Sequence, residues 1–314
     1  MTNLTVVDAH CDTITKLMAT NEKLHTNNGH FDLHRANKYN SFVQFFAAFI
    51  HPDYCPDKAY QRCIDIIKHL EIEIAKNQEH IMLVRKYEDI SDAIKLGKIA
   101  AVLTIENGGA LEGDIKKLDE FYKLGVRSIC LTWNGSNQLA CGVRGDNLDG
   151  GLTPFGFDVV KRMNELRMLV DVSHINEASF WDVMNTSTSP IIASHSNSKT
   201  VCDHVRNLTD EQFKALVKNG GVTGMNLCPP FLNENEDPNM DDIVRHIEHF
   251  MSLGGENHVG MGADLDGISN TPKDVRGVED FDAIFEALLR KNYSEEQVNK
   301  IAGLNFLRVL ERVI

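Results

Sequence analysis

The sequence predicts an α/β protein folded as a (β/α)8 barrel of the TIM type. Short segments rich in Val, Ile, Leu and Phe recur eight times, and amphipathic stretches lie between most of them. Parallel βα units give this alternation, and eight strands close such a barrel. The length of 314 residues suits a barrel in one domain, 1–314, because α/β barrels of roughly 250 residues or more form single units.

The expected strands alternate with helical stretches along the chain. The eight strands are Leu4–His10, Phe42–Ile50, Ile99–Glu106, Val126–Thr132, Met168–His174, Ile191–His195, Val222–Leu227 and His258–Asp264. A ninth apolar segment, His80–Val84, is either an extra strand outside the barrel or no strand at all.

Three expected helices and one irregular segment complete this pattern. Asp57–Lys76 and Asp241–Leu253 each place apolar residues on one face at helical spacing, which indicates core packing. Ser294–Val313 is the expected last helix. The polar, glycine-punctuated segment Gly135–Pro154 is either a lid over the active-site end of the barrel or a solvated connector.

Composition narrows the class of function. Acidic side chains outnumber basic ones by 45 to 32, and the formal net charge of −13 argues against nucleic acid as a partner, because it would repel phosphates. No run approaches the roughly 18 apolar residues of a membrane helix, and we expect neither a secretory signal nor a lipid anchor. The seven cysteines include no C-x-x-C pair, so a reducing cytoplasm is the expected setting.

Ionisable residues close five of the expected strands. They are His10, Glu106, His174, His195 and Asp264. A single histidine at a strand end is more often a hydrogen-bonded structural residue. Five ionisable residues at the C-terminal ends of barrel strands favour a catalytic site, because barrel enzymes carry their active sites there.

The residue types at these strand ends indicate a metal centre. His10 and Asp12 are two positions apart, so in an extended strand they point to the same side and can bind one ion. His174 and His195 end consecutive strands and suit a second ion. Glu106 lies between the two pairs and can bridge them, since two-metal hydrolytic sites hold their ions about 3.5–4 Å apart. Imidazoles and carboxylates are typical ligands of catalytic zinc, so we expect two divalent ions, Zn2+.

Two further residues are candidates for catalysis and substrate binding. Asp264, in GMGADLDG, is the expected proton shuttle, because metal binding lowers the pKa of water towards ~7 and a neighbouring carboxylate can take the proton. Arg206, in SNSKTVCDHVRN, either pairs with an acidic side chain at the surface or reaches the barrel mouth. There its guanidinium would hold a carboxylate through two hydrogen bonds.

The chain resembles the membrane (renal-type) dipeptidases, zinc metallopeptidases of the amidohydrolase-like superfamily. The motifs that carry this resemblance are DAHCD, TIENGG, GLTPFGFDVVKRMNELRMLVDVSH, ASHSNSKTVCDHVRN and HVGMGADLDG, which span nearly the whole chain. The resemblance implies the same five ligands, with Glu106 bridging two zinc ions. It also implies proton transfer by Asp264, recognition of the dipeptide's C-terminal carboxylate by Arg206, and a homodimer.

One position departs from the family pattern. Family members have a histidine after the fourth strand that contacts the substrate near the reacting carbonyl, whereas ICLTWN places Trp133 there. An indole has one N–H donor and carries no positive charge, so that N–H, the adjacent Asn134 or the metal ions must polarise the carbonyl. We therefore predict that Trp133 and Asn134 bind substrate and that the substrate range is altered.

The resemblance predicts a binuclear-zinc dipeptidase whose substrates include L-Xaa-D-Xaa dipeptides. Two alternatives stay open at this point. One is a hydrolase of another small amide or lactam on the same barrel. The other is a catalytically retired, metal-binding module.

Overall fold

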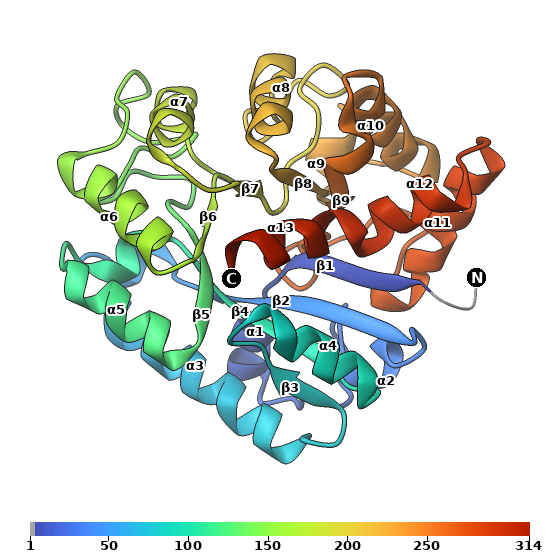
Figure 1. Ribbon diagram of the computed structural model, residues 1–314, viewed down its shortest axis with the longest axis horizontal. Helices are drawn as coiled ribbons and strands as arrows, with labels where there is room; N and C mark the ends of the chain where they lie inside the picture. The colour runs from blue at the N-terminus through green and yellow to red at the C-terminus, as the bar shows by residue number, and fades with distance from the viewer. Residues whose placement is uncertain (1–3) are drawn as a thin grey trace.

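The computed structural model describes residues 4–314 and shows a closed barrel of eight parallel strands with helices around it (Figure 1). Neighbouring strands pair in parallel, and the β1–β9 and β2–β4 pairings complete the ring. The strands are β1 Thr5–Cys11, β2 Ser41–Phe49, β3 Ile81–Leu83, β4 Ile99–Glu106, β5 Val126–Cys130, β6 Leu169–Asp171, β7 Ile192–Ala193, β8 Val222–Met225 and β9 Val259–Met261.

Helices connect successive strands and cover the outside of the barrel (Figure 1). The helices are α1 Thr13–Thr20, α2 Leu33–Ala36, α3 Ala59–Lys76, α4 Tyr87–Lys95, α5 Ile115–Leu124, α6 Pro154–Glu165, α7 Glu177–Thr186, α8 Asp210–Asn219, α9 Pro229–Leu232, α10 Met240–Ser252, α11 Phe281–Arg290, α12 Glu295–Asn299 and α13 Asn305–Val313. The order βαβα and the closed parallel sheet confirm the predicted (β/α)8 barrel.

The ninth apolar segment forms a strand outside the barrel. In β3, Ile81 pairs with Ile99 at the start of β4. From Leu103 onward, β4 pairs instead with β5. The first half of β4 thus has β3 as its neighbour and the second half has β5, so β3 extends the sheet without entering the ring.

Helix α13 closes the end of the barrel at which the strands begin. Val7, Val43 and Val222 of the barrel interior belong to one buried apolar cluster with Phe306 and Leu310 of α13. Figure 1 shows α13 crossing this end of the barrel. The opposite end, where the strands finish, is therefore the end at which a site can open to solvent.

We expect one continuous helix over Ser294–Val313, but the structure interrupts it. A π-helical segment, Lys300–Leu304, separates α12 from α13. Gly303 of this segment lies against β1, where a Cβ atom would come within 2.3 Å of the carbonyl oxygen of Thr5. This close approach to the backbone of β1 accompanies the local widening of the helix, a known form of helix irregularity.

The three strands expected to carry His174, His195 and Asp264 end earlier than their apolar patterns predict. β6 ends at Asp171, β7 at Ala193 and β9 at Met261, although their patterns continue to His174, His195 and Asp264. The carboxylate of Asp171 accepts the backbone N–H groups of Ser173 and Ser194, at 2.9 and 3.0 Å. These N–H groups bond to a side chain instead of a neighbouring strand, and the ladder stops there.

The segment 135–154 is fastened to the turn that follows β6. Val143 N–H donates to the carbonyl oxygen of His174 at 2.8 Å, and Asn176 N–H donates to that of Cys141 at 3.0 Å. The side chain of Asn176 also donates to Leu148 O at 2.7 Å and to Gly150 O at 2.8 Å. These bonds hold the segment beside His174.

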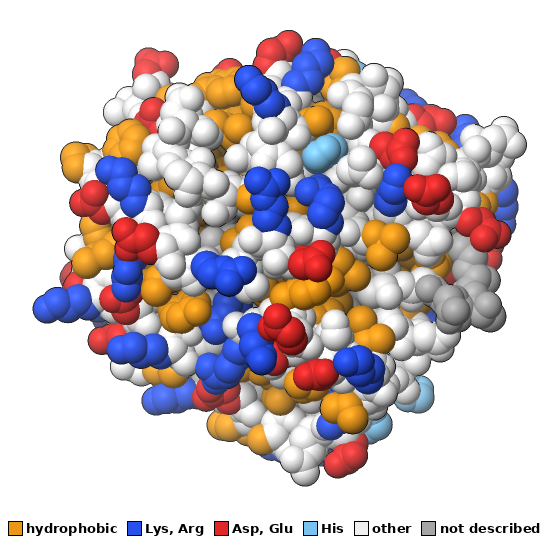
Figure 2. Space-filling view, in the orientation of Figure 1, with side chains coloured by type: hydrophobic (Ala, Val, Ile, Leu, Met, Phe, Trp, Pro, Cys, Tyr) orange, Lys and Arg blue, Asp and Glu red, His pale blue; other side chains and the backbone are white. Residues whose placement is uncertain are grey.

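None of the helices in residues 4–314 is long and apolar enough to cross a bilayer. Figure 2 shows the face that α13 crosses. Lys and Arg side chains are intermingled on it with Asp and Glu, and apolar patches lie between them.

His246 of α10 is buried behind the segment that follows β7. Its Nδ1 accepts the backbone N–H of Ser198 at 3.1 Å, and its Nε2 donates to Leu232 O at 3.0 Å. Burial lowers the pKa of His246 to about 4. The imidazole is therefore neutral in the folded protein at neutral pH.

This neutral histidine should make stability depend on pH. Between its usual pKa of 6.5 and the folded value of about 4, the unfolded chain binds more protons than the folded one, so stability falls as pH falls. From pH 7 to pH 4, wild type should lose roughly 3 kcal/mol more unfolding free energy than His246→Asn, at about 1.4 kcal/mol per unit of pKa. Urea unfolding of both metal-free proteins measures this, and parallel pH profiles would contradict it.

Candidate metal centre

The predicted ligands converge at the end of the barrel where the strands finish. His10 lies in β1 and Glu106 is the last residue of β4. His174 and His195 follow β6 and β7 in the chain. All four side chains are buried, with Asp12 beside them. The structure thus brings together residues that are up to 185 positions apart in the sequence.

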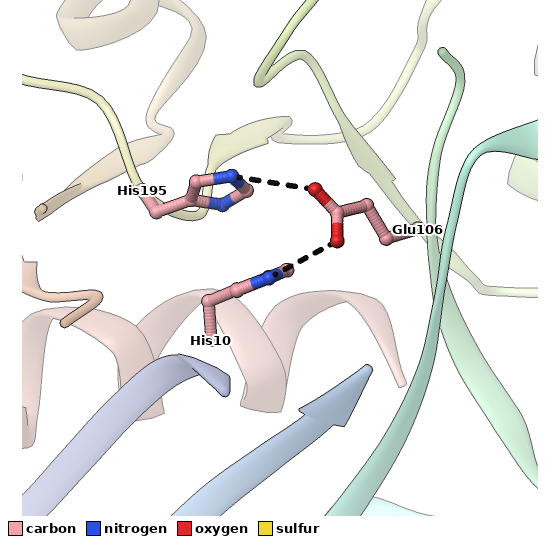
Figure 3. A group of neighbouring side chains, drawn as sticks. All are labelled: His10, Glu106 and His195. Carbon is pink, nitrogen blue, oxygen red and sulfur yellow. Dashed lines mark ion pairs between the residues drawn. The ribbon is translucent and has the colours of Figure 1, made fainter. Parts of the chain in front are cut away.

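The carboxylate of Glu106 faces two sets of imidazoles. Its Oε2 lies 3.4 Å from His10 Nε2, and its Oε1 lies 2.9 Å from His174 Nε2 and 3.8 Å from His195 Nε2. Figure 3 shows the two oxygens pointing to different histidines, His10 and His195. One carboxylate therefore separates the nitrogen donors into two groups.

The first group gathers around His10. Its Nε2 lies 3.3 Å from Asp12 Oδ2 and 4.0 Å from Asp264 Oδ1. The other oxygen of Asp12, Oδ1, is buried and has no hydrogen-bond partner among the described residues. A buried carboxylate oxygen without a partner is costly, and it is free here to bind a cation.

Gly267 lies directly against this group. A Cβ atom on Gly267 would come within 2.3 Å of Asp12 Oδ2 and 2.4 Å of Asp264 Oδ1. Any larger residue would push one of the two carboxylates out of place. The sequence analysis missed this residue, although the glycine that closes the motif GMGADLDG is the signal that could have indicated it.

In the second group, the Nε2 atoms of His174 and His195 lie 2.8 Å apart. His174 Nδ1 donates to Asn134 Oδ1 at 2.9 Å, because an amide oxygen can only accept. Ser194 Oγ lies 2.5 Å from Asp171 Oδ2 and 2.7 Å from His195 Nδ1. Since the carboxylate only accepts, Ser194 donates to Asp171 and accepts from His195.

These bonds fix which nitrogen of each imidazole carries the proton. With Nδ1 protonated in both His174 and His195, both Nε2 atoms present lone pairs. These two nitrogen atoms lie 2.8 Å apart. Their lone pairs and the nearby carboxylate oxygen of Glu106 repel one another unless a cation lies among them. The donor set therefore fits a divalent metal ion, and the hydrogen bonds of the outer nitrogens orient the ligands as in known metal sites.

The pKa values of His174, His195 and Glu106 favour the protonation states that bind metal ions. Burial lowers the pKa of His174 to about 3 and that of His195 well below its usual value, so both imidazoles are neutral. Burial alone would raise the pKa of Glu106, but His10 and His174 outweigh it and hold that pKa well below its usual value. Neutral imidazole and ionised carboxylate are the forms that bind metals.

Positive charge is favoured at the first group. Burial lowers the pKa of His10, but the charges of Glu106 and Asp12 outweigh it and raise that pKa well above its usual value. Burial raises the pKa of Asp264 to about 7 and that of Asp12 to about 6. The carboxylates of Asp12, Glu106 and Asp264 surround His10 Nε2. Their mutual repulsion is relieved when a proton or a metal ion lies among them.

Arg206 is buried at 4% exposure, so its side chain is not a surface residue. One of its terminal nitrogens donates to His195 O at 3.3 Å. Its Nε is buried and has no hydrogen-bond partner among residues 4–314. The arginine therefore lies beside the metal centre with an unused donor.

Trp133 and Asn134 differ in their placement. Trp133 lines a cavity of about 510 Å³ with Phe49, Glu106 and His174, and its ring centroid lies 5.4 Å from that of Phe49. Asn134, in contrast, has its Oδ1 bonded to His174. Of the two, Trp133 is the residue that faces the open space beside the ligands.

A centre of imidazoles and carboxylates at this end of a (β/α)8 barrel is typical of metal-dependent hydrolases. The chain belongs to the membrane dipeptidase family, peptidase family M19, whose model matches residues 1–314. It is a metallo-dipeptidase, a hydrolase of peptide bonds, and a family of metallopeptidases implies a divalent metal.

Individual relatives agree with this assignment. An uncharacterized protein from the pqqA 5′ region of Klebsiella pneumoniae is 37% identical over 257 residues, which cover 79% of this chain and 93% of that protein. An uncharacterized dipeptidase of Schizosaccharomyces pombe is 32% identical over 299 residues, 90% of this chain and 72% of that protein. A metallopeptidase of Rhodobacter sphaeroides, solved with a phosphinate mimic of L-Ala-D-Ala, superposes with a TM-score of 0.91 at 26% identity, covering 99% of this chain and 100% of that one.

Removing the hydroxyl that orients His195 should weaken metal binding. We expect Ser194→Ala to lower zinc affinity about 10–100-fold, the usual effect of losing an outer partner of a ligand histidine. Competition titration with a chelator measures this. The control is Ser128→Ala, whose hydroxyl is equally buried and donates to Leu169 O, 3.2 Å away, without touching a predicted ligand. Equal zinc affinity in the two variants would show that the Ser194 bond does not orient a ligand.

Proposed function

We propose that this metallo-dipeptidase holds two zinc ions and cleaves dipeptides, including L-Xaa-D-Xaa dipeptides. The observation that carries the proposal is the placement of Glu106, whose Oε2 faces His10 and whose Oε1 faces His174 and His195. A carboxylate with donors on both sides suits a bridge between two ions.

The remaining ligands divide in the same way. His10 and Asp12 would complete one ion's protein ligands, and His174 with His195 would complete the other's. Each ion would then have three protein ligands of the types that catalytic zinc takes. When bound, such ions lower the pKa of water towards ~7 and polarise a carbonyl group.

Asp264 is placed to move the proton. Asn226 donates to its Oδ2 at 3.0 Å, and its Oδ1 lies 4.0 Å from His10 Nε2. The carboxylate also lines the 510 Å³ cavity. Held by one oxygen and open at the other, Asp264 would take a proton from the attacking water and pass it to the departing amine.

Arg206 and Trp133 would contact the dipeptide itself. The unused Nε of Arg206 and its guanidinium fork suit a carboxylate, which a dipeptide carries at its C-terminus. Trp133 and Phe49 form an aromatic wall of the larger cavity and would pack against the N-terminal residue. Asn134 would act through His174, and its role as a direct substrate contact is the weaker alternative.

A relative supports the proposed chirality of the substrate. The Rhodobacter sphaeroides metallopeptidase was solved with a phosphinate mimic of L-Ala-D-Ala. Its similarity to this chain extends over nearly the full length, so we propose that dipeptides with a D-residue at the C-terminus are among the substrates here.

The test is reconstitution with zinc followed by a dipeptide panel. We expect two equivalents of tightly bound zinc, turnover of dipeptides of both C-terminal chiralities, and loss of turnover on chelation. Asp264→Asn should keep both equivalents and lose at least roughly 100-fold in kcat, the usual value of a positioned acid–base group. One equivalent of zinc, or two equivalents with turnover of N-acyl or cyclic amides only, would refute the proposal.

A second prediction concerns Arg206. Arg206→Lys keeps the positive charge and loses the planar fork that binds a carboxylate through two hydrogen bonds. We expect KM for dipeptides to rise at least roughly tenfold, since such charge-assisted bonds are worth about 1.5–3 kcal/mol. Zinc content should stay at the wild-type value. Unchanged KM with intact zinc content would mean that Arg206 does not hold the carboxylate.

A further inference from the structure

A second, smaller cavity lies beside the metal centre and is lined by residues of α7, of α8 and of the segments that precede these helices. Its volume is about 300 Å³, at the lower end of the roughly 300–1,000 Å³ of ligand pockets. His174 lines both this cavity and the larger one. The two cavities therefore adjoin the same proposed ligand, and the smaller one has room for a side chain.

Two buried polar groups in the smaller cavity lack partners. Arg206 and Ser196 both line it, at 4% and 1% exposure. Neither Arg206 Nε nor Ser196 Oγ has a hydrogen-bond partner among the described residues. Leaving such groups unpaired costs free energy, and both side chains belong to the wall that a ligand in this cavity would meet.

The rest of the wall is largely apolar. Val172, Ile175 and Phe180 are buried and line the cavity. At its mouth lie Leu148 and Val205, which stay 56% and 48% exposed. Exposed apolar side chains at the rim of a pocket are typical of ligand-binding sites.

The charges at the rim do not favour an ionic side chain. Glu177 and Lys199, of opposite sign, both line the cavity. Lys199 is already paired with Asp203 at 2.5 Å.

The backbone at Leu148 is held in place, since the side chain of Asn176 donates to the Leu148 carbonyl oxygen at 2.7 Å. This hydrogen bond thus keeps an apolar residue at the mouth of the cavity.

We propose that this cavity receives the side chain of the C-terminal residue of the dipeptide and selects apolar residues there, such as leucine. The inference rests on the proposed contact between Arg206 and the substrate carboxylate. The carboxylate and the side chain of that residue branch from one Cα atom. A carboxylate bound at Arg206 therefore brings the side chain to the opening of the apolar cavity.

The test compares kcat/KM of the zinc-loaded enzyme for Ala-Leu, Ala-D-Leu and Ala-Gly. We expect wild type to prefer at least one leucine dipeptide over Ala-Gly by about tenfold or more, the usual value of filling an apolar pocket. Leu148→Asp and Val205→Asp should reduce that preference about tenfold, since each places a charge at the apolar mouth. Ala-Gly turnover of the same variants is the reference for this ratio, because glycine has no side chain to bind.

The matched control is Ile72→Asp on α3, an apolar residue that is 51% exposed on a helix that does not line this cavity. It should keep the full preference for leucine. Equal use of Ala-Gly and the leucine dipeptides by wild type, or an unchanged preference in both mouth variants, would overturn the inference while leaving the dipeptidase intact. Absence of turnover on all three dipeptides would overturn the proposed function, and this inference with it.

Discussion

The burial of Glu106 among three imidazoles is the constraint on which the site depends. A buried carboxylate is costly unless charged or hydrogen-bonding partners surround it, and here His10 and His174 supply them from opposite sides. The barrel holds this group rigidly, because Glu106 pairs with Phe49 of β2 on one side and with Cys130 of β5 on the other. A shift of this one side chain would alter both groups of donors at once.

Other residues of the candidate site are held by different means. His174 and Asp264 lie beyond the ends of their strands, in the left-handed region with φ of 70° and 60°. Such conformations cost about 1–3 kcal/mol each in residues other than glycine, so surrounding contacts must maintain them. For His174 these are the bond that its Nδ1 donates to Asn134 Oδ1 and the bond that its carbonyl oxygen accepts from Val143 N–H. For Asp264, the backbone N–H donates to His10 O at 3.2 Å and Asn226 holds the side chain.

The segment 135–154 consequently serves the site from outside the barrel. It carries Val143 to the carbonyl of His174 and Leu148 to the mouth of the smaller cavity. One connection thus orients a proposed zinc ligand and shapes a proposed substrate contact. Although the segment is rich in glycine, backbone hydrogen bonds and close packing hold it in place. At Gly142, for instance, a Cβ atom would come within 2.3 Å of Trp133 O.

The sequence alone determined the barrel, because strand and helix periodicities are local properties. The β4 boundaries agree with the predicted ones, Ile99–Glu106, and the candidate ligands could be chosen from their places at strand ends. Only the tertiary structure decided that the strands of His174, His195 and Asp264 end early, and that Asn134 bonds to His174. It also revealed the chain of hydrogen bonds from Asp171 through Ser194 to His195. These contacts join residues 23 and 40 positions apart, and they exist only once the closed ring brings the ends of separate strands together.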